Sequence, residues 1–232
     1  MSIDKIEDDV DQGFNYVYSE KKIPLPERRF GVLPLDLELF LGQKGCTSGP
    51  IKQKANCLVR QGIQNNPDRS FLYAVADVYS HLSGQRITED VLRKRLLQKL
   101  SSSLFHSLSG GRIARLFHYL ESFKDYLMRE EGRISENFIW DLVSRPNILT
   151  TKGLNILVLT PHSIHCPLGE NPSEFYHLDR ETILLMKNGD LYEPIYRISL
   201  PQSKIVIQPI HSPFEPHTRS LLTFAQKGCQ PY

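Results

Sequence analysis

The sequence predicts an α+β domain in which a layer of helices packs on a small mixed sheet. Residues 68–143 carry apolar side chains at helical spacing, whereas apolar runs of strand length follow from residue 153. The Asn188-Gly189 pair between two of these runs is a strong signal for a β-hairpin. Helices first and strands afterwards, around one core, are typical of this class. With 232 residues, 40% of them hydrophobic and 23% charged, the chain can bury one sizeable core.

Composition limits the classes of function. The net charge of +2 does not indicate a nucleic-acid or membrane partner. The four cysteines, at positions 46, 57, 166 and 229, lack the close paired spacing of zinc or redox sites, so we expect reduced thiols. Residues 1–11 are acidic without an apolar signal segment, and no run of about 18 apolar residues occurs. We therefore expect a protein of the cytosol, or of a compartment assembled from it, that works without a cofactor.

Three segments are predicted along the chain. Residues 1–30 are charged and carry two prolines, which suits a flexible or docking arm. Residues 31–210 form the α+β domain, and residues 211–232 form a tail. At the start of the domain, residues 31–42 combine several leucines with Pro34, so the pattern fits either a short strand or a helix that begins at the proline.

Four helices are predicted between residues 68 and 143. Asp68 and Ser70 are favourable helix-start residues, and the apolar positions that follow them recur at helical spacing. Thr88 begins a second helix, with two acidic residues in its first turn. A third helix follows Gly110-Gly111, and Ser135 begins a fourth that ends before a proline. The buried stripe of the third helix is predicted to be Ile113, Leu116, Phe117, Leu120, Phe123 and Leu127.

The strands are predicted in the last third of the chain. Gly153–Leu159 is a continuous apolar run, and the hairpin joins Ile183–Lys187 to Asp190–Tyr196. Pro194 cannot donate a ladder hydrogen bond, which predicts an edge strand or a bulge for the second arm of the hairpin. Residues 204–210 supply one further strand.

Ser70 lies at the position where a helix N-terminus could activate a nucleophile. The helix dipole and the unpaired backbone N–H groups favour a thiolate there. A serine hydroxyl gains far less, because it needs an adjacent base to become nucleophilic at neutral pH. The simpler interpretation is that Ser70 is only an N-cap.

Ser70-Phe-Leu-Tyr-Ala-Val-Ala-Asp77 resembles the nucleophile helix of the OTU (ovarian tumour) cysteine proteases, whose pattern is Asp-Gly-Asn-Cys-Leu-Phe-Arg-Ala. The order of segments downstream is also similar: Trp140-Asp141-Leu142, a buried strand over residues 156–159, and then a hairpin. The resemblance implies an OTU-like architecture of the papain-like superfamily.

The same resemblance implies a degenerate site. The family carries its catalytic histidine, followed by tyrosine, at the start of the second hairpin arm, where this chain has Leu191-Tyr192. Thiol and base are both missing, so Asp68, Ser70 and Leu191 mark the positions of a lost catalytic site. The resemblance predicts Ser70 at a helix N-terminus beside the strand that begins near Leu191, in a pseudo-protease that serves as an interaction or structural module.

A second resemblance concerns viral proteins. Residues 71–79, Phe138-Ile-Trp-Asp141 and residues 183–196 are similar to segments near the N-terminus of large proteins of nucleocytoplasmic large DNA viruses, the giant-virus and iridovirus relatives. This resemblance implies that the chain is one module of a longer protein, cut within its tail. It also implies a place in the viral factory of the host cytoplasm or in the virion, with viral or host proteins as partners and ubiquitin among the candidates.

One alternative is an active deubiquitinase-like cysteine hydrolase. Asn56-Cys57-Leu-Val-Arg60 echoes the OTU string and offers a thiol, with His177 as the fallback base. The residues after Arg60 cannot continue as a helix, however, so Cys57 would lack activation by a helix dipole.

Two further patterns carry weaker hypotheses. His162, His165 and Cys166 form a compact group after the predicted strand, but a fourth zinc ligand is absent from their vicinity. A nucleic-acid-associated scaffold of viral transcription or packaging would need a basic surface. The candidate residues belong to polar helix faces without interleaved aromatics; they are Arg93, Lys94, Arg95, Lys99, Arg112 and Arg115.

Overall fold

A central mixed sheet organises the structure, a computed structural model that describes residues 16–229 except positions 44, 55, 162, 170, 202 and 203. Nine strands are present in this part of the chain, in the order β3-β1-β2-β4-β8-β7-β5-β6, with β9 paired to β8. The pairs β1–β2 and β5–β7 are parallel, and the other pairs are antiparallel. The strands are β1 Tyr16–Tyr18, β2 Phe30–Val32, β3 Gly49–Pro50, β4 Leu58–Gln61, β5 Asn155–Leu159, β6 Ile164–His165, β7 Thr182–Asn188, β8 Leu191–Ser199 and β9 Val206–Gln208.

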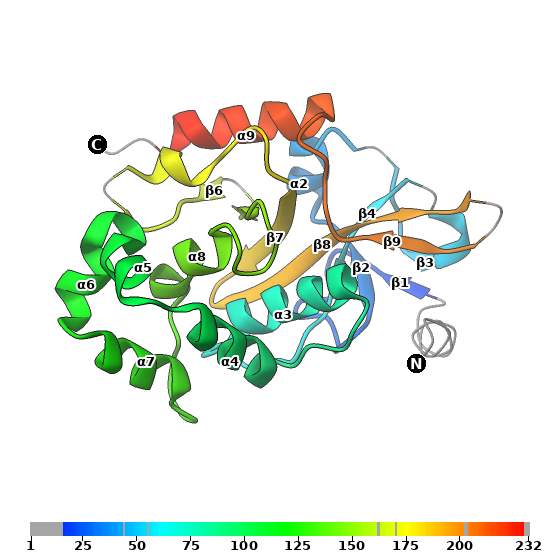
Figure 1. Ribbon diagram of the computed structural model, residues 1–232. Helices are drawn as coiled ribbons and strands as arrows, with labels where there is room; N and C mark the ends of the chain where they lie inside the picture. Colours follow the sequence, from blue (N-terminus) through cyan, green and yellow to red (C-terminus); the bar gives the residue numbers. More distant parts are fainter. Residues whose placement is uncertain are drawn as a thin grey trace.

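Helices cover both faces of this sheet (Figure 1). Most lie on one face, and α2 and α9 lie on the other. The α+β class predicted from the sequence is confirmed. The sheet is larger than predicted, and α2 and α9 cover its second face. The helices are α2 Leu35–Phe40, α3 Ser70–Ser83, α4 Glu89–Lys99, α5 Ser102–Ser107, α6 Arg112–Phe117, α7 Leu120–Met128, α8 Glu136–Ser144 and α9 Pro216–Gly228, with short 3-10 turns at Ile51–Gln53, Leu108–Gly111 and Pro172–Phe175.

The interior strands divide their apolar side chains between two cores. In β5, Ile156 and Val158 pack into the core shared with α3 to α8, whereas Leu157 and Leu159 pack into the core under α2 and α9. Successive side chains of a strand point to opposite faces, so a continuous apolar run fits a sheet that is covered on both sides. The continuous apolar sequence of β5 is thus explained by burial of both of its faces, one in each core.

The helix starts agree closely with their sequence signals. Thr88 caps α4 by accepting a hydrogen bond from Val91 N, and Ser135 caps α8 by accepting from Asn137 N. The third predicted helix was wrong as a single element. His118 adopts a positive φ of 60°, which ends α6, and α7 restarts at Leu120. Leu116, which was predicted to belong to the buried stripe, is half exposed.

The hairpin forms one residue later than predicted. Asn188 pairs with Leu191, so Gly189 and Asp190 are the two turn residues. Gly189 has a φ of 60°, while Asn188 is not among the residues with positive φ. The predicted edge position of the second arm was also wrong, because β8 lies between β4 and β7. Pro194 is tolerated because the β4 ladder covers residues 195–197 of β8 and stops short of it.

The described parts of the predicted arm and tail belong to the fold. In residues 16–30, β1 joins the sheet and Leu25 is buried, while residues 1–15 lie outside the described part of the chain. In residues 211–232, α9 buries Leu222 and Ala225 in the second core. Residues 31–42 contain both of the elements left open by the sequence, a strand up to Val32 and a helix after Pro34.

The expectation of reduced thiols was wrong. Cys46 is bonded to Cys57, and Cys166 is bonded to Cys229, so no cysteine is free. The partners are 11 and 63 residues apart in sequence. Pairing across such distances follows from the path of the chain and leaves no spacing motif.

Candidate functional site

Ser70 is the first residue of α3 and lies against the beginning of β8. Its side chain is buried, and Oγ accepts a hydrogen bond of 2.7 Å from the backbone N–H of Tyr192. The same hydroxyl lies 3.5 Å from the carbonyl oxygen of Tyr192. The predicted placement of Ser70 at a helix N-terminus beside the second hairpin arm is therefore confirmed. The simpler N-cap interpretation was wrong. The N-cap residue is Arg69, and the Ser70 hydroxyl accepts its hydrogen bond from β8.

In the turn that leads into α3, the backbone N–H groups of Asp68 and Arg69 donate hydrogen bonds within the turn. Asn66 accepts both of them: its Oδ1 from Asp68 N at 3.0 Å, and its carbonyl oxygen from Arg69 N at 3.2 Å. On the other side, the carbonyl of Asp68 accepts from Ile134 N at 2.9 Å. An acyl-transfer site needs free donors near its nucleophile to stabilise an oxyanion. Here the two N–H groups that precede Ser70 are already engaged.

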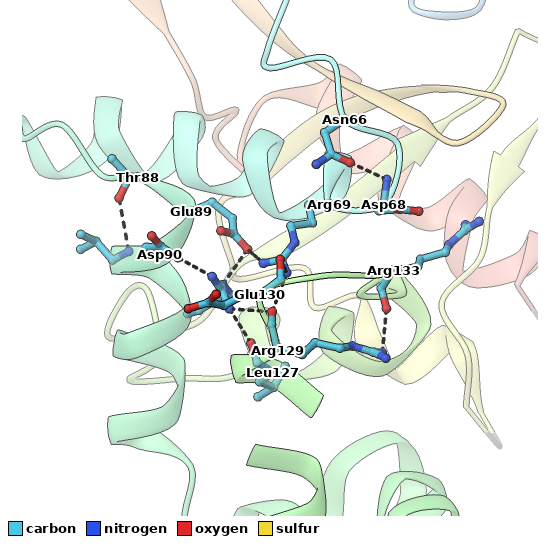
Figure 2. A network of polar contacts seen from close by, with 12 residues as sticks. Asn66, Asp68, Arg69, Thr88, Glu89, Asp90, Leu127, Arg129, Glu130 and Arg133 are labelled. Carbon is cyan, nitrogen blue, oxygen red and sulfur yellow. Dashed lines mark hydrogen bonds and ion pairs between the residues drawn. The ribbon is translucent and has the colours of Figure 1, made fainter. Parts of the chain in front are cut away.

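A buried ionic network fixes Arg69, the residue before Ser70 (Figure 2). One carboxylate oxygen of Glu89 contacts Arg69 Nη1 at 3.0 Å and Arg93 Nε at 2.7 Å. Arg69 Nη2 also donates to the carbonyls of Arg129 and Glu130, each at 2.5 Å. The network ties the starts of α3 and α4 to the segment after α7. The α3 N-terminus is thus held in place by charge pairs and carbonyls.

The residues around Ser70 are aromatic and apolar. Phe71 contacts the rings of Tyr192 and Trp140, with centroids 5.3 and 5.8 Å apart. Leu191, at the position of the family's histidine, is half buried. Among the described residues, the hydrogen bonds of Ser70 go to the Tyr192 backbone and none goes to a histidine. Among the described contacts, the Ser70 hydroxyl therefore lies at a helix N-terminus beside β8 without a side chain that could act as its base.

A polar cluster lies beside Tyr192. Glu136 Oε1 is 2.9 Å from Lys187 Nζ and 3.6 Å from His165 Nε2. Burial by itself would raise the pKa of Glu136, but the hydrogen bonds to His165 and Lys187 and the charge of Lys187 outweigh it and hold that pKa well below its ordinary 4.5. Burial raises the pKa of Tyr192 far above its usual value, so the phenol stays neutral. The sequence interpretation missed Glu136 and Lys187, because nothing local shows that α8 and β7 meet.

Replacing Glu136 with glutamine is expected to lower the free energy of unfolding by about 1 to 2 kcal/mol near neutral pH. Because the folded pKa of Glu136 lies below 4.5, the stability it contributes is present above that pH and is lost as the pH falls. Urea denaturation at about pH 7 and about pH 3 should show the difference from the parent shrinking at the lower pH. Glu121→Gln, which alters an exposed pair with Lys124, is the matched control with little expected change. A deficit for Glu136→Gln that does not vary with pH would contradict this account.

The fallback residues are separated from one another. Cys57 is bonded to Cys46, so its proposed role as a nucleophile was wrong. His177 lies in the segment before β7, where its backbone N–H donates to Asn155 Oδ1 and burial lowers the pKa of its ring. No described contact joins His177 to Ser70 or to Cys57.

Two of the three predicted metal ligands have other partners in the structure. Cys166 is bonded to Cys229, and His165 belongs to the Glu136 cluster. His162 lies outside the described residues. Within the described part of the chain, no three His, Cys, Asp or Glu side chains are grouped so that they could hold a metal ion.

No family model matches the sequence. The chain is similar to part of a giant-virus protein. That relative is "Uncharacterized protein R327" of Acanthamoeba polyphaga mimivirus, which is 28% identical over 197 residues. The match covers 74% of this chain and 12% of the relative, so the chain spans only a small part of the viral protein's length. The resemblance to large proteins of large DNA viruses is thereby confirmed.

One solved structure with a similar fold is described as "Structure of Ovarian Tumor (OTU) domain in complex with Ubiquitin". It is 13% identical, with a TM-score of 0.45, and the match covers 75% of this chain and 86% of that chain. A separate finding concerns membranes: none of the helices in the described ranges has both the length and the apolar character needed to cross a bilayer.

Proposed function

We propose that this chain is a catalytically inactive, OTU-like protein-interaction module of a larger viral protein. The observation that carries the proposal is the hydrogen bond between Ser70 Oγ and the backbone N–H of Tyr192. It uses the hydroxyl at the nucleophile position to join α3 to the sheet. A buried acceptor that satisfies a buried N–H stabilises the fold, and it is unsuited to attack a carbonyl without a base.

Two further observations support inactivity. The N–H groups of Asp68 and Arg69 are engaged by Asn66 and so are not offered to an oxyanion. The position of the family's histidine is occupied by Leu191, which can neither accept nor donate a proton. With the nucleophile and the base replaced, and the N–H groups of Asp68 and Arg69 engaged, binding is the function that the site can still perform. The partners would be viral or host proteins, with ubiquitin as the first candidate to test.

The place of action is part of the same proposal. A module of a giant-virus protein would work in the host cytoplasm, where the virus assembles, or in the virion. The disulfides Cys46–Cys57 and Cys166–Cys229 favour the virion, since disulfides persist on virion surfaces and are rare in the reducing cytosol.

The oxidised protein is expected neither to cleave ubiquitin chains nor to react with a ubiquitin-based thiol-reactive probe. All four cysteines are bonded in pairs, and Ser70 lacks a base. The measurement is a gel-shift assay with the probe, together with a chain-cleavage assay, using an active OTU enzyme as the positive control. Binding of isotope-labelled ubiquitin, followed by NMR, tests the candidate partner separately. Cleavage that disappears in Ser70→Ala would overturn the proposal, because it would make Ser70 a working nucleophile.

Restoring the two family residues is not expected to restore activity. Ser70→Cys with Leu191→His supplies a thiol and an imidazole, but the N–H groups of Asp68 and Arg69 remain engaged. Sulfur is also a weak acceptor, so the Tyr192 N–H loses most of its hydrogen bond at a cost of about 1 to 3 kcal/mol. We expect a less stable protein without measurable turnover.

Ser70→Cys alone serves as the matched control for that double variant. It should account for most of the loss of stability, because Leu191 is only half buried. Turnover by the double variant well above that of Ser70→Cys would show that the cleft retains its oxyanion donors. In that case recent loss of two reactive groups would explain the chain better than a long-standing binding role.

A further inference from the structure

A cavity of about 350 Å³ lies on the far half of α3, away from Ser70. Its walls come from α3 from Tyr73 onward, the loop between α3 and α4 with the start of α4, the end of β4 and the segment after it, and Glu27 and Arg28 ahead of β2. Ile207 of β9 completes the lining. The volume falls in the lower part of the range of small-ligand sites. Nothing in the function proposed above uses this cavity.

Asp77 places a carboxylate in the lining. Its side chain is only 26% exposed, and Oδ2 accepts a hydrogen bond of 2.5 Å from the Tyr196 hydroxyl. The nearest ion-pair partner is His81 Nε2 at 4.0 Å. Burial raises the pKa of Asp77 and lowers the pKa of His81, so the histidine is a poor counter-ion at neutral pH. Among the described ion pairs, none joins Asp77 to a lysine or an arginine.

Gln61 supplies a second acceptor without a donor. The residue is 3% exposed, it lines the cavity, and its Oε1 has no hydrogen-bond partner among the described residues. A buried amide oxygen without a partner costs about 1 to 3 kcal/mol, so such groups are usually satisfied by a ligand or by water. Gln61 and Asp77 come from different elements, β4 and α3, and both contribute to the same cavity.

The remaining lining favours an aliphatic chain behind the polar group. Ile63, Ile87 and Ile207 supply apolar walls. At the rim, Arg28 Nε lies 4.0 Å from its neighbour Glu27, and both side chains are about half exposed. An anion would face the Asp77 carboxylate, and a purely apolar ligand would leave the Gln61 oxygen unpaired. A donor group with positive charge is the ligand chemistry that suits both acceptors.

We propose that this cavity binds an alkyl cation, a primary ammonium or guanidinium group on an aliphatic chain, with Asp77 and Gln61 as its acceptors. The group could be carried by a free diamine or by a lysine or arginine side chain of a partner polypeptide. The charge would be held by Asp77, one donor would satisfy Gln61 Oε1, and the methylene groups would lie against the isoleucines. This site goes beyond the proposed function and is independent of Ser70.

The experiment uses two probes, putrescine and a short glycine-rich peptide with one central lysine. The same peptide with acetyl-lysine is the control, because acetylation removes the charge and keeps the chain. Binding is followed by NMR through the amide signals of Asp77, His81 and Gln61. We expect saturable shifts with at least one cationic probe and none with the acetylated peptide. Tighter binding of putrescine would identify a free amine as the ligand, and tighter binding of the peptide would identify a side chain of a partner.

Asp77→Asn is the test variant, since it removes the charge while keeping an acceptor for the Tyr196 hydroxyl. We expect its dissociation constant to rise by about tenfold or more, because hydrogen bonds to charged groups are the stronger ones. Glu121→Gln, an exposed carboxylate on α7 outside the cavity lining, is the matched control and should change binding by less than about twofold. Gln61→Met keeps the proposal testable if Asp77→Asn does not fold, and it should also weaken binding. Equal affinity for the charged and acetylated peptides, or no shift with either cationic probe, would overturn the proposal.

Discussion

Replacing Glu193 with alanine is expected to lower the free energy of unfolding by about 3 to 5 kcal/mol. Glu193 Oε2 lies 2.6 Å from Arg60 Nη1, and the two side chains are 5% and 0% exposed. Glu193 Oε1 accepts from Leu25 N at 2.8 Å, and Arg60 donates to the carbonyls of Val32 and Lys22. Removing the carboxylate leaves a buried guanidinium without its counter-ion and an N–H without its acceptor. Urea denaturation of parent and variant measures the loss.

Two control variants distinguish a buried charge from a general packing defect. Arg60→Met with Glu193→Leu removes both charges at similar volume, and it should cost less than Glu193→Ala because no uncompensated charge remains. Asp190→Ala breaks the exposed pair with Arg133, whose side chains are 55% and 46% exposed, and should cost less than about 1 kcal/mol. If Asp190→Ala destabilised the protein as much as Glu193→Ala, burial of the pair would not be the cause.

Replacing Cys166 and Cys229 with serine is expected to lower the free energy of unfolding by about 4 kcal/mol. The disulfide closes a loop between residues 63 apart in sequence, so it restricts the unfolded chain strongly. It also ties Cys229, at the end of α9, to the segment that follows β6. Urea denaturation of the oxidised parent and of the double variant gives the difference directly.

Loop length provides the comparison for this result. Cys46 and Cys57 are 11 residues apart, so replacing both with serine should cost less, about 3 kcal/mol. The parent treated with a reductant should then be less stable than either double variant. Should the short loop prove as costly as the long one, restriction of the unfolded chain would not explain the effect. Full stability after verified reduction would likewise contradict it.

Much of the candidate site could be predicted because its parts are local. The start of α3 at Ser70 follows from the turn formed by Asn66 and Asp68 and from the apolar spacing behind it. The start of β8 follows from the glycine turn at position 189. The family resemblance then placed these two ends together, and the hydrogen bond between Ser70 and Tyr192 joins them.

Other features of the site and of the cavity could not be predicted from a pattern. Glu136 and Lys187 are 51 residues apart, and nothing near either one shows that the two meet. Asp77 and His81 do have a local signal, since residues four apart share a helix face, but that spacing does not reveal the cavity beside them. The unpaired oxygen of Gln61 also has no signal in the sequence, because its burial and its lack of a described donor depend on the folded chain.

The sequence by itself determined the local elements of this protein: the capped starts of α4 and α8, the apolar run of β5, and the presence of serine at position 70 and leucine at position 191. Each of these depends on a few neighbouring residues, which act through backbone geometry and side-chain periodicity. Only the tertiary structure decided which distant groups pair. Arg60 meets Glu193 across 133 residues, and Cys166 meets Cys229 across 63, because the order of strands and the path of α9 bring them together. Short-range patterns carry no information about such pairing, since burial and charge compensation are properties of the folded chain.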